Sequence, residues 1–163
     1  NNKFHIKTME GKEDITSITT LNFKDRDLDV KKDIIGVFDQ IIGVDHITGK
    51  IFRLYNSTFN RIPDYEGYSY WIKIKNDNSI TYKDIAHSFI TSSEFIQKNG
   101  YTLTNENYLE LLYSNSFNRS ADIEGYNYWL GQLNSGIETQ ADILMNFAES
   151  DESKVLFSSQ TML

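Results

Sequence analysis

Charged residues that could bind a ligand recur at the same spacing in two parts of the chain. The two sets are Arg61, Asp64 and Glu66, and Arg119, Asp122 and Glu124. A carboxylate pair beside a guanidinium can coordinate calcium or grip sugar hydroxyls through charge-assisted hydrogen bonds. A structural role competes with binding, because Asp can cap a helix, Glu can interact with the helix dipole and Arg can fix the corner through a bidentate pair. We favour the structural role, since two copies of one corner would need the same residues.

Aromatic residues follow each set and are the best ligand-binding candidates. They are Tyr65, Tyr68, Tyr70 and Trp71, and then Tyr126, Tyr128 and Trp129. Flat aromatic faces stack on sugar rings while nearby polar groups bond the hydroxyls. On a helix, Tyr70 and Trp71 would share the core-facing side and Tyr68 would point elsewhere. We expect Trp71 and Trp129 to be mainly core with an exposed edge, and Tyr65 to lie at the surface.

A third candidate is a run of carboxylates near the N-terminus. Asp25, Asp27 and Asp29 alternate with other residues, so they would share one face of a strand. Such an edge could bind calcium, although a solvated charge run interleaved with Lys is the commoner explanation.

Enzymatic signatures are absent from the sequence. There is no Gly-x-Ser-x-Gly elbow, no His-Glu-x-x-His and no phosphate-binding glycine loop. The chain has no Cys, which excludes a thiol nucleophile, a disulfide scaffold and a Cys-ligated metal. We therefore predict a protein that is not an enzyme.

A gapless internal repeat positions the candidate residues. Residues 54–94 and 112–152 align at an offset of 58, with 18 identities in 41 positions. Apolar residues at helical spacing predict a first helix in each copy, and Asp64 or Asp122 predicts the start of a second. Thr-x-x-Asp, a variant of the capping box, predicts the start of a third.

The N-terminal region differs from the repeat. Residues 19–23 and 28–30 predict short strands or an extended arm. Residues 34–44 fit either a further strand or the lead-in to the first helix. The predicted fold is mainly α: two pseudo-repeated three-helix units forming one helical domain (45–163), preceded by a β or extended arm (1–44). Repeat one covers about residues 50–100 and repeat two about residues 104–160.

The composition constrains the partners. Of the formal net charge of −7, nearly all lies in residues 101–163, which carry 2 basic and 9 acidic residues. An acidic surface repels phosphate backbones, so we expect no nucleic-acid partner. No apolar run approaches the ~20 residues that a membrane helix needs, so we expect no membrane insertion.

The repeat resembles a known bacterial family. Its pattern, LYxxxFNRxxDxEGxxYWxxxL followed by TxxxIxxxFxxSxE, is similar to the "domain of unknown function 4214", and the similarity covers about residues 50–160. Members of that family contain tandem all-α units, often inside large secreted, surface-layer or RTX-type proteins, and are distantly similar to phycobilisome linker domains.

The resemblance implies an extracellular or cell-surface bacterial module. We expect it to bind a glycan or a cell-surface protein, or to mediate adhesion, as part of a larger secreted protein. The alternative is a purely structural spacer or assembly domain, with or without calcium. The sequence leaves the particular sugar or partner and the oligomeric state open.

Overall fold

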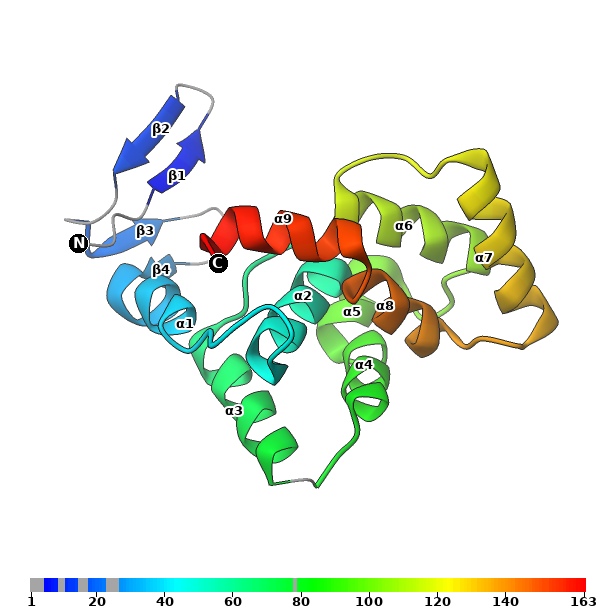
Figure 1. Ribbon diagram of the computed structural model, residues 1–163, viewed down its shortest axis with the longest axis horizontal. Helices are drawn as coiled ribbons and strands as arrows, with labels where there is room; N and C mark the ends of the chain where they lie inside the picture. The colour runs from blue at the N-terminus through cyan, green and yellow to red at the C-terminus, as the bar shows by residue number, and fades with distance from the viewer. Residues whose placement is uncertain (1–4, 9–10, 15–17, 23–26, 78) are drawn as a thin grey trace.

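Two short β hairpins precede a body of helices, as the computed structural model in Figure 1 shows. The structure describes residues 5–8, 11–14, 18–22, 27–77 and 79–163. Strand β1 (His5–Thr8) pairs antiparallel with β2 (Gly11–Asp14), and β3 (Thr20–Asn22) pairs antiparallel with β4 (Asp27–Asp29). The predicted mainly α fold with a short N-terminal β arm is therefore confirmed.

A helical lead-in connects the strands to the repeat. It consists of η1 (Val30–Ile35), which is π-helical, and α1 (Gly36–Phe38). Asp29 caps its start by accepting from the backbone N–H of Lys32 at 2.8 Å. Of the two alternatives for residues 34–44, the lead-in to the first helix is the one that forms.

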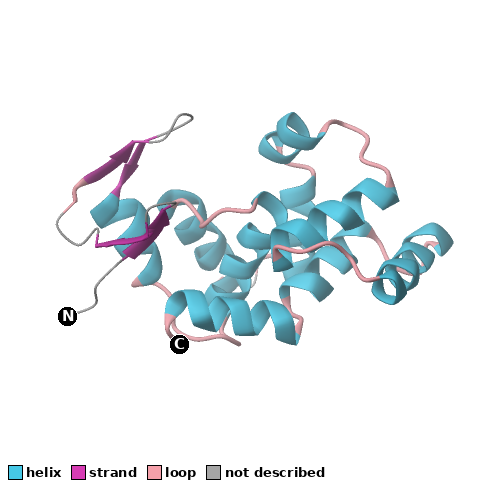
Figure 2. Cartoon of the chain, turned by 90° about the horizontal axis from the view of Figure 1, so that it is seen from above, coloured by secondary structure: helices cyan, strands magenta, loops and turns pink. Residues whose placement is uncertain are grey.

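The two copies of the repeat form two helical units, seen from above in Figure 2. Unit one contains α2 (Ile47–Phe59), α3 (Tyr65–Asn76), α4 (Tyr82–Ile90) and α5 (Ser93–Asn99). Unit two contains α6 (Asn105–Phe117), α7 (Ile123–Ser135), α8 (Gln140–Ala148) and α9 (Asp151–Thr161).

Local sequence sets the helix boundaries as the repeat predicts. Thr81 and Thr139 each form a capping box with the Asp three residues later. Asn60 and Asn118 end α2 and α6 in the left-handed conformation, both at φ 52°. Asn tolerates this conformation better than most residues, so both first helices stop one residue before the Arg of the corner.

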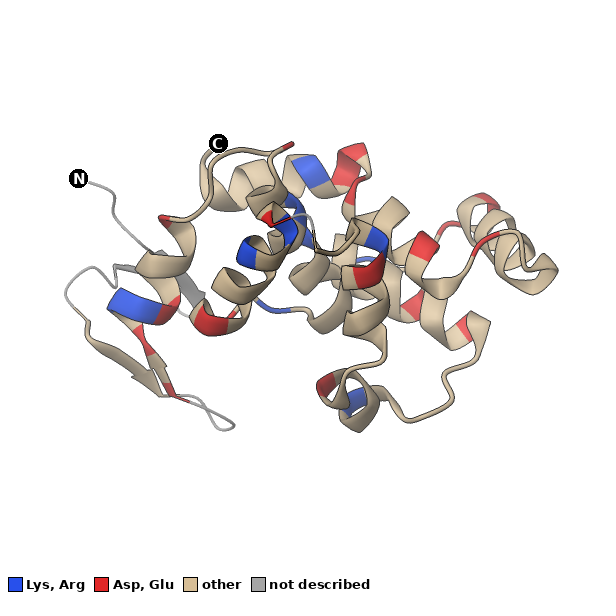
Figure 3. Ribbon diagram, turned by 90° about the horizontal axis from the view of Figure 1, so that it is seen from below, with Lys and Arg blue, Asp and Glu red and all other residues tan. Residues whose placement is uncertain are grey.

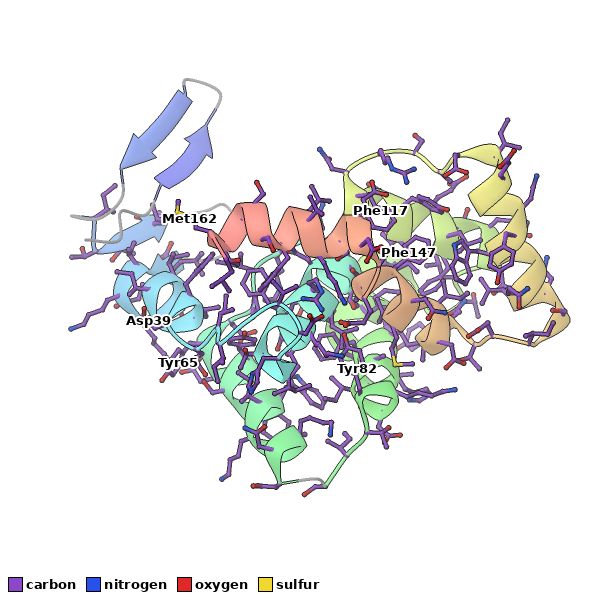
Figure 4. The ribbon with its side chains drawn as sticks, in the orientation of Figure 1. Asp39, Tyr65, Tyr82, Phe117, Phe147 and Met162 are labelled. Carbon is purple, nitrogen blue, oxygen red and sulfur yellow. The ribbon has the colours of Figure 1, made fainter. Side chains whose placement is uncertain are left out.

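Each unit is built around four aromatic rings at matching positions. In unit one they are Tyr55, Phe59, Trp71 and Phe89, and in unit two they are Tyr113, Phe117, Trp129 and Phe147. The centroids of the first tyrosine and the last phenylalanine are 4.8 Å apart in unit one and 4.9 Å apart in unit two. Figure 4 labels Phe117 and Phe147, which stack between α6 and α8. The repeated identities in the sequence are thus largely core.

The two units share one core because equivalent helices pack against each other. Helix α2 packs on α6, α4 packs on α8, and α9 lies against both α2 and α6. On α9, Phe157 is 1% exposed and meets the ring of Phe52 edge to face at 5.4 Å.

A fully buried arginine joins the units. Arg53 donates to the carbonyl of Ala148 at 2.6 Å, to the carbonyl of Val44 at 2.7 Å and to a carboxylate oxygen of Glu149 at 2.7 Å. Tyr82, labelled in Figure 4, donates to the same carboxylate at 3.2 Å. Leu111 occupies the matching position of unit two, so this link exists once and the repeat gave no signal for it.

The prediction of which tyrosines of α3 face the core was wrong. Tyr68 is fully buried, with its hydroxyl donating to the carbonyl of Thr48 at 2.8 Å, whereas Tyr70 is 56% exposed. Tyr68 packs against Phe52 of α2, with 6.3 Å between the ring centroids, and the helical lead-in also contacts α3.

Among the described helices, none has both the length and the apolar character needed to cross a membrane.

Candidate functional site

At the corner between α2 and α3 of unit one, Arg61 pairs with Glu94 of α5. Nε and Nη2 of Arg61 donate to the two carboxylate oxygens of Glu94, both at 2.8 Å, and Nη1 donates to the carbonyl of Ile62 at 3.0 Å. The guanidinium also lies over the rings of Tyr55 and Phe59, at 5.2 and 5.3 Å from their centroids. This bidentate pair ties the α2–α3 corner to the start of α5.

Unit two repeats this arrangement. Arg119 donates to the two oxygens of Glu152 at 2.9 and 2.8 Å and to the carbonyl of Ser120 at 3.1 Å. The hydrogen bonds from Arg119, more than the surrounding charge, hold the pKa of Glu152 below its ordinary value. We call each such arginine–glutamate pair, Arg61–Glu94 and Arg119–Glu152, a clasp.

The aspartates cap the second helices, as the sequence predicts. Asp64 accepts from the backbone N–H of Gly67 at 2.7 Å, and Asp122 accepts from that of Gly125 at 2.8 Å. The bond from Gly125, assisted by Arg119, lowers the pKa of Asp122. The predicted bidentate pair exists, but the arginine makes it with Glu94 or Glu152, while its shortest distance to the capping aspartate is 3.4 Å in unit one and 3.6 Å in unit two.

The glycines of the corner make room for a tyrosine hydroxyl. A Cβ atom at Gly67 would lie 2.5 Å from the hydroxyl oxygen of Tyr55, and one at Gly125 would clash with the hydroxyl of Tyr113. The corner therefore needs glycine for the close approach of the first helix.

The two glutamates of the candidate sets differ in their surroundings. Glu66 pairs with Lys32 from the lead-in η1. Glu124 is exposed, and no partner for it is found in the part of the chain that the structure describes. The corner residues are thus engaged within the fold, apart from Glu124.

Each unit presents an exposed tyrosine beside a half-buried tryptophan. Tyr70 is 56% exposed and meets Trp71 edge to face at 5.2 Å; Tyr128 is 58% exposed and meets Trp129 at 4.8 Å. We call these two pairs the aromatic platforms. Tyr65 is 36% exposed, but its ring lies against Gly36 of α1, and its counterpart Ile123 is 80% exposed.

The carboxylates proposed for calcium lie in or near β4. Asp27 and Asp29 are both exposed, as expected for one face of a strand. Asp27 accepts from the side-chain amide of Asn22 at 2.8 Å, and Asp29 caps η1. Asp25 lies outside the described residues. Within the described ranges, no three acidic or histidine side chains are grouped closely enough to hold a metal ion.

These features define a class: a tandem-repeat helical domain in which two clasped units share a core and carry an exposed aromatic platform each. The family model "Domain of unknown function (DUF4214)" matches residues 50–99 and 86–157, which together span more than half of the chain. The chain belongs to this family. No curated protein and no solved structure matches it.

Proposed function

We propose that the chain is a non-enzymatic, extracellular binding module of a larger secreted bacterial protein, and that it binds a glycan through its aromatic platforms. One observation carries the proposal: Tyr70 and Tyr128, at matching positions, both remain exposed. Neither hydroxyl has a hydrogen-bond partner among the described residues, and the tryptophans already contact the core through Phe89 and Phe147.

The composition of the platforms supports the proposal. In each, a tyrosine and a tryptophan packed edge to face offer an apolar surface for the C–H groups of a pyranose, and a polar side chain lies one helical turn later. That side chain is Lys73 in unit one and Gln132 in unit two. If one polymer chain reaches both platforms, bivalent binding raises avidity without new contacts.

The structural alternative has its own support. The clasps and the buried Arg53 use charged groups entirely for joining helices, which is what a spacer or assembly domain needs. The two functions differ in one respect: a spacer has no use for an exposed tyrosine at Tyr70 or Tyr128.

The test is a glycan array, with and without calcium, followed by titration of any hit against Tyr70→Ala, Tyr128→Ala and the double variant. Each lost ring should weaken binding about two- to tenfold, because stacking contributes roughly 0.5–1.5 kcal/mol. Tyr101→Ala, at a residue 90% exposed, is the control and should bind normally. Tryptophan fluorescence should change on binding, because Trp71 and Trp129 form the edges of the platforms.

If no sugar binds in either condition, the glycan proposal fails and the structural alternative stands. If a sugar binds only with calcium and Asp27→Asn with Asp29→Asn abolishes it, the β4 carboxylates form the site instead of the platforms.

A further inference from the structure

Unit two has an open hollow between α6 and α7. Its volume is about 860 Å³, and its walls include Glu110, Ser120, Ile123 and Asn127. The hollow lies away from the platform: on α7, Ile123 and Asn127 are one turn apart on one side, and Tyr128 is a further 100° around the helix.

The chain itself covers the matching place on unit one. The lead-in lies there, with Gly36 so close to Tyr65 that a Cβ on Gly36 would be 3.1 Å from the ring. Gln40, just after α1, accepts from the hydroxyl of Ser69 at 2.9 Å. Phe38 meets Phe52 at 5.7 Å between ring centroids, and Lys32 pairs with Glu66.

Comparing the two places residue by residue shows what would fit the open one. Three contacts of the lead-in keep a counterpart in unit two: Glu66 corresponds to Glu124, Ser69 to Asn127 and Tyr65 to Ile123. Two further positions that contact the lead-in change from apolar to polar. Phe52, which meets Phe38, is replaced by Glu110, and Ile62, which packs against Val30 and Ile34 of η1, is replaced by Ser120. The hollow in unit two therefore keeps a carboxylate, Glu124, at the position that pairs with Lys32 in unit one. It also keeps an apolar side chain, Ile123, and gains a second negative charge at Glu110.

We propose that this hollow is a docking site for a short helix of a partner protein that presents two cations on its docking face and lies on unit two as the lead-in η1–α1 lies on unit one. A lysine of the partner pairs with Glu124, a second cation faces Glu110 and a small residue packs on Ile123. The charge of the region agrees, since residues 101–163 carry 9 acidic and 2 basic residues, and Arg119, the one basic residue in the wall of the hollow, already pairs with Glu152. In Figure 3, the part of the molecule that α7 occupies shows acidic positions and little blue. This site is separate from the aromatic platforms and does not depend on the glycan proposal.

The absence of cysteine from the chain allows a direct test by disulfide trapping. The probe is a synthetic peptide of residues 28–41 that carries Gly36→Cys, to face position 123, and Phe38→Lys, to face Glu110. The protein carries Ile123→Cys. The control protein carries Ile137→Cys, which is similarly exposed (71% against 80%) and lies beyond α7. We expect trapping at position 123 to be at least about tenfold faster than at position 137; equal rates overturn the proposal.

Charge exchange tests the anchor. Changing Lys32 to Glu in the peptide should slow trapping at position 123 about tenfold, and Glu124→Lys in the protein should restore it. Failure of the second change to rescue the first overturns the pairing with Glu124. Tyr128→Ala should leave trapping unchanged, so failure of the glycan proposal and failure of this one give different results.

Other occupants produce their own outcomes, and each overturns the proposal. Disulfide dimers of the Ile123→Cys protein, formed without peptide and faster than those of Ile137→Cys, identify a second copy of the chain as the occupant. A glycan whose binding is lost in Ile123→Asp but kept in Tyr128→Ala identifies the hollow as a sugar site.

Discussion

Of the three arginines Arg53, Arg61 and Arg119, Arg53 should be the one whose replacement by methionine destabilises the protein most. The side chain is fully buried, and its three hydrogen bonds run to the end of α8 and to the loop before α2. Methionine fills much of the volume but offers no donor, so the substitution isolates the loss of these bonds.

The magnitude follows from which partners are left unsatisfied. The carboxylate of Glu149 keeps Tyr82 at 3.2 Å and Lys50 at 3.4 Å, so it is not abandoned. The carbonyls of Val44 and Ala148 lose their side-chain donor, and each unsatisfied buried acceptor costs about 1–3 kcal/mol. We therefore expect Arg53→Met to lower the free energy of unfolding by about 4 kcal/mol.

The assay is urea denaturation followed by tryptophan fluorescence, which gives the free energy of unfolding by linear extrapolation. The matched control is Arg119→Met, because the side chain of Arg119 is 40% exposed and its ion pair is screened by water. That variant should lose only about 1 kcal/mol. A loss below about 1 kcal/mol for Arg53→Met, or a larger loss for Arg119→Met, refutes the reasoning.

Four further substitutions test other contacts. Gly125→Ala should destabilise the protein by about 1–3 kcal/mol through overpacking of the corner, whereas Gly131→Ala, with open space around it, should stabilise α7 by roughly 0.5–1 kcal/mol in the same urea assay. Glu152→Gln should flatten the acid limb of a stability–pH curve. Arg119 holds the pKa of Glu152 below its ordinary 4.5, so the carboxylate stabilises the fold above that pH, and its contribution is lost as the pH falls through the folded-state pKa. Phe157→Ala should cost about 3–5 kcal/mol by calorimetry, because it opens a cavity beneath α9; a change under 1 kcal/mol would mean that α9 is not part of the core.

Local chemistry explains what the sequence could predict. A capping aspartate or threonine acts within four residues, so Asp64, Asp122 and both Thr-x-x-Asp boxes could be read directly from the chain. The repeat also indicated core aromatic positions such as Phe89 and Phe147, but identity alone did not separate core from surface, because Tyr70 and Tyr128 also recur and both are exposed.

Contacts between distant residues explain what could not be predicted. Glu94 and Glu152 lie 33 residues after their arginines, so their spacing did not indicate a pair. The presence of Glu in both copies at the last aligned position of the repeat was the only sign of the clasp in the sequence. Tyr68 is buried against Thr48 and Phe52 of α2, which the helical periodicity of α3 alone does not encode. The hollow on unit two could be recognised as a site only by comparing the contacts that equivalent residues make in the two units.

The bonds of Arg53 also have a consequence for the timing of folding during synthesis. Its partners in unit two lie 95 and 96 residues further along the chain, and the ring that covers Phe52 belongs to α9. The first helix of unit one is therefore completed by contacts with the end of unit two. Unit one cannot reach its final packing until unit two has emerged from the ribosome.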